Sequence, residues 1–133
     1  MRCLQAFEAE TGVTATDCVI DDAFDRIIVL VDPDDMAAAI GPGGATVRAA
    51  ESTLGRNIKV VQSAETPEEL LANALSPAAV YDVTVETRGE DRVAVVDVDE
   101  YDRGVAIGTD GESVAVAKIL AERYFDIDDV LIE

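Results

Sequence analysis

The 133-residue sequence predicts an α+β protein that contains two copies of one α-β-β-α-α-β unit. The main observation is a repeat, because AIGPGGATV (residues 39–47) returns as AIGTDGESV (residues 106–114). A strand-like run that begins with Asp-Arg precedes each copy, and a helix-length stretch and a short aliphatic strand follow it. We therefore expect one domain over residues 1–63 and a second over residues 64–133.

In the first unit, a helix over residues 4–11 precedes two strands, at residues 16–22 and 25–32, whose β-branched content favours a hairpin. A short alanine-rich helix then leads into the glycine-rich loop, a longer helix leaves it, and a strand at residues 57–61 closes the unit. The helix positions expected to face the core are Leu4, Phe7, Thr11, Val47, Ala50 and Leu54.

The second unit repeats this order, and its first helix has a clear start. Thr66-Pro67 is a typical helix beginning, with Glu68 and Glu69 in the first turn. Strands at residues 80–87 and 91–98 flank an Arg-Gly-Glu turn, and residues 128–133 form the last strand. The helix positions expected to face the core are Leu70, Leu71, Ala74, Val114, Ala117, Leu120 and Ala121. The linker near residues 63–66 is too short for a free tether, so the two units are expected to pack as one rigid body.

The composition is strongly acidic, with 28 acidic and 10 basic residues and a formal net charge of −18. An apolar content of 49% argues against disorder. Scarce lysine, abundant aspartate and small aliphatic residues resemble the proteins of halophiles that accumulate salt. In about 1 M salt, charge repulsion is screened within roughly 3 Å. The fold is therefore expected to gain stability from salt.

Several functional classes are disfavoured by what the sequence lacks. Cys3 and Cys18 stand without any histidine or a Cys-x-x-Cys pair, so no metal site is expected. Two free thiols are favoured over a disulfide between them. The longest apolar run, residues 27–31, is too short to cross a membrane, and the charged N-terminus does not resemble a signal peptide. We expect a cytoplasmic protein with no membrane partner.

The repeated loop has the pattern Gly-x-x-Gly between two helices. Glycines allow a sugar-phosphate backbone to touch the main chain, and the helix that follows directs its N-terminal amides and positive dipole end at the phosphate. A single Gly-x-x-Gly is a weak signal. Its occurrence at matching places in two units, each time after Ala-Ile, makes it a strong one.

This arrangement resembles KH domains, whose loop clamps about four nucleotides of a single strand. With the extra helix and strand ahead of the core, each unit resembles the type II variant. FEAETGVTATDCVIDD and GVAIGTDGESVAVAKILAERYFDIDDVLI further resemble the archaeal NusA-like transcription termination and antitermination family, over nearly the whole chain. The resemblance implies single-stranded RNA as a partner, RNA polymerase as a second one, and no cofactor.

The residues expected to contact RNA are Gly41, Pro42, Gly43, Gly44, Arg48, Lys59, Gly108, Thr109, Asp110 and Gly111. KH loops usually carry a basic residue at one of the two central positions, and neither loop here does. Asp110 would place a carboxylate against the phosphate, so the first loop is expected to be the better binder. For the second loop, RNA binding and a helix-helix turn retained with weakened binding are both open.

Arg48, one turn into the second helix, could reach a phosphate or pair with Glu51, and its repeat counterpart is Ala115. Arg56 and Lys59 add positive charge nearby. Ile40 and Val47 are expected in the core, and the alternative is an apolar wall for stacked bases.

An enzyme is disfavoured, because the loop lacks the GK[ST] of a P-loop and the chain has neither histidine nor a G-x-S-x-G motif. The alternative to RNA binding is an acidic protein-protein adaptor whose KH folds no longer bind nucleic acid. The high negative charge of the chain and the carboxylate of Asp110 favour that alternative.

Overall fold

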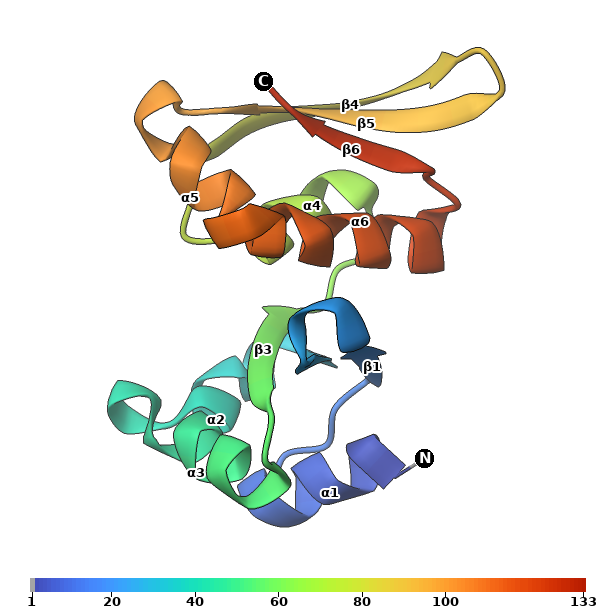
Figure 1. Cartoon of the computed structure of the whole chain (residues 1–133). Coiled ribbons are helices and arrows are strands. Elements are labelled where there is room, and N and C mark those ends of the chain that lie inside the picture. The colour runs from blue at the N-terminus through green and yellow to red at the C-terminus, as the bar shows by residue number, and fades with distance from the viewer. Residues whose placement is uncertain (1) are drawn as a thin grey trace. The chain divides into compact units, whose positions relative to one another are not determined.

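A computed structural model describes residues 2–133, which divide into two compact units between Ser63 and Ala64. Each unit has a three-stranded sheet with helices packed on one of its faces (Figure 1). The predicted α+β class and the predicted order of helices and strands are confirmed in both units.

The first domain contains a mixed sheet with strand order β1-β2-β3. Strands β1 and β2 form the predicted hairpin, and β2 and β3 run parallel. Parallel neighbours need a crossover connection, and the two helices around the first glycine loop provide it. The elements are α1 (Arg2–Thr11), β1 (Asp17–Asp21), β2 (Arg26–Val31), α2 (Met36–Ile40), α3 (Ala45–Leu54) and β3 (Asn57–Gln62).

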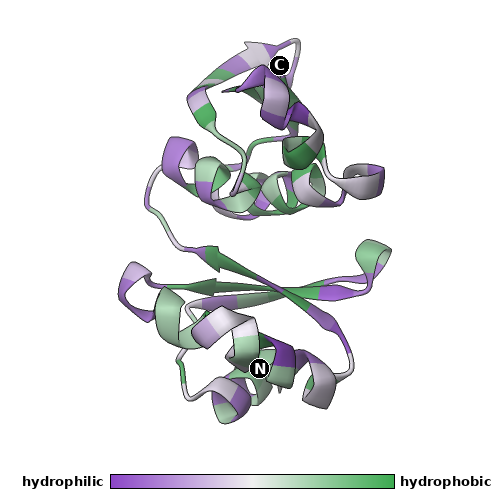
Figure 2. Cartoon of the chain, turned by 90° about the vertical axis from the view of Figure 1, so that its left-hand side faces the viewer, coloured by the Kyte–Doolittle hydropathy of each residue, from purple (hydrophilic) through white to green (hydrophobic). Residues whose placement is uncertain are grey.

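The core of the first domain lies between its helices and the sheet. Phe7 of α1 packs with alternate residues of β2, among them Val29 and Val31, all buried. In Figure 2 the strands of this sheet are largely green, the colour of hydrophobic residues. Cys3 and Cys18 are free thiols, as predicted, and the Cys3 thiol lies 3.7 Å from the Cys18 carbonyl oxygen. Burial raises the pKa of the Cys18 thiol, which stays protonated.

The second domain has the same topology, with strand order β4-β5-β6 and a longer hairpin. The predicted start of α4 is confirmed. Thr66 is the N-cap, its hydroxyl accepts a hydrogen bond from the Glu69 N–H at 3.3 Å, and Pro67 occupies the first turn. The elements are α4 (Pro67–Leu75), β4 (Val80–Arg88), β5 (Asp91–Val98), α5 (Arg103–Ile107), α6 (Glu112–Phe125) and β6 (Asp129–Ile132).

Most of the predicted core positions are buried. The fully buried ones are Phe7, Ala50, Leu70, Leu71, Ala74, Ala117, Leu120 and Ala121. The half-buried ones are Leu4, Thr11, Val47, Leu54 and Val114. None of the helices among residues 2–133 is long and apolar enough to cross a membrane.

The placement of Ile40 in the core is wrong. Its side chain is 36% exposed, and its repeat counterpart Ile107 is 38% exposed. Both residues end a five-residue helix, and such a short helix turns only one position fully inward, Ala39 or Ala106. An isoleucine is thus exposed directly before each glycine loop.

Candidate nucleic-acid interface

The first glycine loop connects α2 to α3 and contains three residues with positive φ. Gly41 has φ 78°, Gly43 has φ 59° and Gly44 has φ 80°. A Cβ on Gly41 would lie 2.7 Å from the backbone nitrogen of Thr46 and closer still to the Thr46 hydroxyl oxygen. Only glycine fits at this position, because both the backbone conformation and the close approach of Thr46 exclude a side chain.

The second loop, between α5 and α6, has nearly the same backbone. Gly108 has φ 80° and Gly111 has φ 81°. A Cβ on Gly108 would meet the Ser113 hydroxyl oxygen at 2.6 Å. The hydroxyl residues Thr46 and Ser113 are not among the residues predicted from the sequence. The sequence pattern that points to these two residues is a Thr or Ser five positions after the first glycine of each loop.

The two loops differ in the side chains that the shared backbone presents. Asp110 has φ 56° and takes the place of Gly43. Aspartate tolerates this left-handed conformation better than most residues do. Its side chain is exposed, as are Pro42 and Thr109 at the neighbouring position. The second loop therefore carries a carboxylate where the first loop presents bare main chain.

Arg48 lies over the first loop. Its guanidinium Nη1 donates a hydrogen bond to the Gly43 carbonyl oxygen at 2.6 Å, and a Cβ on Gly44 would lie 2.7 Å from the same Nη1. The alternative of an ion pair with Glu51 is wrong, since Glu51 Oε2 accepts from the Ile58 N–H at 2.9 Å. Helix α3 begins within one turn of this arginine, so its positive charge and the helix N-terminus are directed at the same exposed loop.

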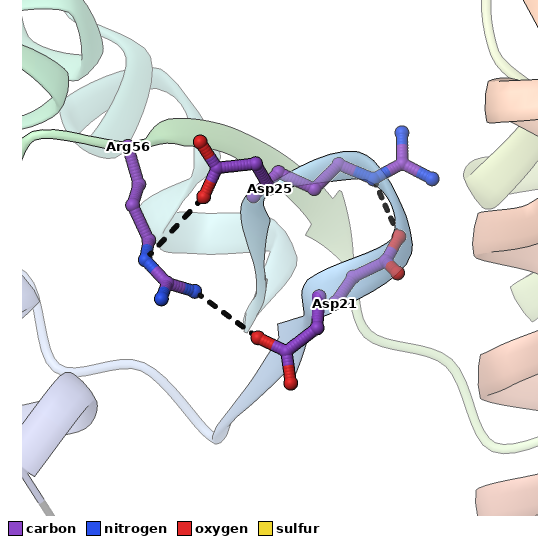
Figure 3. A network of polar contacts seen from close by, with 5 residues as sticks. Asp21, Asp25 and Arg56 are labelled. Carbon is purple, nitrogen blue, oxygen red and sulfur yellow. Dashed lines mark hydrogen bonds and ion pairs between the residues drawn. The ribbon is translucent and has the colours of Figure 1, made fainter.

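Arg56 is not available to the loop, because carboxylates neutralise it. Its Nη1 lies 3.7 Å from Asp22 Oδ1 and its Nε lies 3.8 Å from Asp25 Oδ1 (Figure 3). In the same hairpin, Arg26 Nε donates to Asp21 Oδ2 at 2.8 Å, and this ion pair is buried. Two of the first domain's arginines therefore stabilise the end of its hairpin.

Lys59 is a half-buried residue of β3, an edge strand of the first sheet that contacts α2. Its neighbours Ile58 and Val60 pack against the core. Because side chains alternate along a strand, Lys59 leaves β3 on the other face of the sheet. The structure therefore brings Gly41, Pro42, Gly43, Gly44 and Arg48 together, whereas Lys59 belongs to the neighbouring strand.

The negative charge is unequally divided between the two domains. Residues 1–63 contain ten acidic and five basic residues, whereas residues 64–133 contain 18 acidic and five basic residues. The formal net charges are therefore −5 and −13. Of the two similar loops, the first lies in the domain that repels phosphate less.

Within the described residues, no group of three or more acidic, cysteine or histidine side chains could hold a metal ion.

Comparisons with known proteins agree with this geometry. Residues 5–66 match the KH domain family, and residues 67–131 match the family of NusA-like second KH domains. A crystal structure of APE1850 superposes with a TM-score of 0.89 at 32% sequence identity, covering 99% of this chain and 96% of that chain.

The curated relatives include proteins of halophilic archaea. A probable transcription termination protein NusA of Halobacterium salinarum is 51% identical over 97% of this chain and 91% of its own length. That of Halococcus morrhuae is 46% identical over 98% and 91%. The transcription termination/antitermination protein NusA of Bacillus subtilis is 33% identical over 90% of this chain and 33% of its own length. This chain of two KH domains therefore belongs to the NusA family of transcription termination proteins.

Proposed function

We propose that this chain binds single-stranded RNA through the loop Gly41–Gly44 of its first domain and acts with RNA polymerase in transcription termination or antitermination. The observation that carries the proposal is the difference between the loops. The first presents bare main chain with Arg48 over it, and the second presents Asp110. The relatives' names support the link to termination.

The first loop attracts phosphate without a basic residue at its centre. Its glycines allow close contact with the RNA backbone, and the first turn of α3 supplies amides without intrahelical partners. In concentrated salt, counterion release contributes little to binding, so lysine-rich loops lose much of their advantage. Binding by main-chain amides is therefore expected to be moderate in strength and shallow in its salt dependence.

The exposed isoleucine before the first loop supports the same function. Ile40 is 36% exposed at the end of α2, and Val47 is half-buried on α3. These two residues flank the loop and can form the apolar wall against which bases pack. This arrangement is the alternative that the sequence left open for Ile40.

A matched pair of loop variants tests the proposal. The double variant Pro42→Asp/Gly43→Asp places two carboxylates in the first loop, and Thr109→Asp creates the same Asp-Asp pair in the second. The fold should survive, because Asp110 already occupies the conformation that Gly43 adopts, and a Cβ on Gly43 meets nothing within 4 Å. The first variant should weaken RNA binding at least tenfold, since like charges in contact repel strongly. The second should change it little.

The measurement is the affinity for a single-stranded oligonucleotide in KCl that keeps all variants folded. Binding by the Pro42→Asp/Gly43→Asp variant that equals that of the parent would contradict the proposal. In that case the glycine loop serves only the fold. The acidic adaptor, favoured by the −13 charge of the second domain, would then be the better description.

A further inference from the structure

A groove of about 240 Å³ lies between α4 and β4 of the second domain. None of its lining residues belongs to a glycine loop. Ala72 and Val80 form part of its apolar lining, and Tyr81 lies beside them. Strand β4 is one of the two edge strands of its sheet, so its outer side has no neighbouring strand within residues 2–133. An edge of this kind is accessible to another chain.

Tyr81 is held in place although its side chain is 65% exposed. The register of β4 against β5 shifts between Val80 and Asp82, so Tyr81 sits at a bulge, a feature that redirects side chains. Its hydroxyl donates a hydrogen bond to the Asp99 carboxylate, and this bond raises the pKa of Tyr81. The ring is thus a fixed, neutral aromatic surface, the kind of residue that is enriched at protein interfaces.

The charged side chains that line the groove are all carboxylates. Glu68 and Glu69 lie in the first turn of α4, and Asp82 follows Tyr81 on β4. All three are exposed, and none forms a salt bridge in the described part of the chain. An RNA phosphate would be repelled here. A long basic side chain would fit, because its aliphatic stem can lie on apolar residues while its charged head reaches carboxylates and an aromatic face.

We propose that the groove between α4 and β4 binds an arginine or lysine side chain of a partner protein, presented by an extended basic segment. The stem contacts Ala72 and Val80, and the cationic head lies between Tyr81 and the carboxylates of Glu68 and Glu69. The site belongs to the domain with net charge −13, which also attracts basic partners over a longer range. The proposal does not depend on RNA binding by the first loop.

The test uses the full chain, labelled with ¹⁵N, and a peptide of six Arg-Ser repeats, in one KCl concentration at which the chain is folded. In an extended peptide, this spacing directs every arginine to one side. The amide signals of residues 68–72 and 80–83 should shift, and a peptide of six Glu-Ser repeats should shift none of them. Shifts spread evenly over all acidic surfaces, or no binding, would overturn the proposal.

Matched variants separate the groove from general acidity. The double variant Glu68→Gln/Glu69→Gln should weaken peptide binding about fivefold. Glu8→Gln/Glu10→Gln removes the same charge from exposed positions of α1 and should leave binding unchanged. Equal losses in both variants would show nonspecific attraction and overturn the proposal.

Two aromatic variants test the ring. Tyr81→Ser should weaken binding, whereas Tyr101→Ser, at a position that is 87% exposed, should not. The spectrum of the remaining residues shows whether each variant is folded. A single-stranded oligouridylate should leave residues 68–72 and 80–83 unshifted. Shifts there as large as those caused by the arginine peptide would assign the groove to RNA and overturn the proposal.

Discussion

The two glycine loops have nearly the same backbone and different chemistry. Gly41 and Gly108 have φ 78° and 80°, Gly43 and Asp110 have φ 59° and 56°, and Gly44 and Gly111 have φ 80° and 81°. The outer glycines and the hydroxyl residue packed on the first of them set the conformation. The central residues and Arg48 set what the loop can bind. The similar conformation of the two loops is therefore no evidence that they bind RNA equally well.

The domains around the loops differ in the same direction. The first has a net charge of −5 and an arginine over its loop, and the second has −13 and a carboxylate in its loop. Exposed tyrosines, in contrast, all lie in the second domain, at positions 81, 101 and 124. From this comparison we propose that the first domain contacts phosphate and that the second contacts protein.

The largest expected effect concerns the shared backbone. Gly41→Ala and Gly108→Ala should each destabilise its own domain by about 3 kcal/mol, from backbone strain and from the clash with Thr46 or Ser113. Native-state hydrogen exchange of buried amides in α3 and α6 reports each domain separately. Gly43→Ala, where a Cβ meets nothing within 4 Å, is the control and should cost less. Equal costs at all three positions would mean that φ alone, and not the hydroxyl contact, selects glycine.

The second prediction transfers the first loop's chemistry to the second loop. In a chain whose first loop carries Pro42→Asp/Gly43→Asp, the changes Thr109→Pro/Asp110→Gly/Ala115→Arg should restore RNA binding. The expected gain is roughly tenfold, or about 1.4 kcal/mol. Fluorescence anisotropy with a labelled oligonucleotide measures it. If there is no gain, the charge of the whole second domain, rather than its loop, prevents binding.

The third prediction concerns Arg48. Arg48→Gln should weaken RNA binding about fivefold, because one charge-assisted contact is lost. Stability should change by less than about 0.5 kcal/mol, since the side chain is exposed. Arg88→Gln, which removes an exposed arginine paired with Glu86 in the β4–β5 hairpin, is the matched control and should leave RNA affinity unchanged. Equal losses of affinity would show that only the net charge of the chain matters.

The smallest expected effect is a difference in salt dependence between the domains. Raising KCl from 0.5 M to 2 M should stabilise both, and the gain in α6 should be about twice that in α3, because the second domain carries more unbalanced charge. Most of the screening is already present at 0.5 M. Hydrogen exchange at the two concentrations measures the gains. Equal gains would show that the uneven charge has no effect on folding.

Local patterns in the sequence were sufficient for much of the fold. The repeat predicted two KH-like units, β-branched runs predicted the strands, and Thr66-Pro67 predicted the start of α4, and the structure contains all three. The sequence also located the first loop and Arg48. It misplaced Ile40 and left the partner of Arg48 open, because both depend on which surfaces the neighbouring segments cover. Motion of the two domains as one rigid body, which the short linker suggests, stays a prediction.

The sequence by itself determined the repeat, the class of fold, the glycine loops and the strong negative charge, since these depend on residue type and on spacing within one segment. Only the tertiary structure decided that Arg56 is neutralised by Asp22 and Asp25, and that Tyr81 borders an acidic groove. The physical reason is the same in each case. These features join side chains on different segments, and folding, not sequence spacing, sets the distances between them.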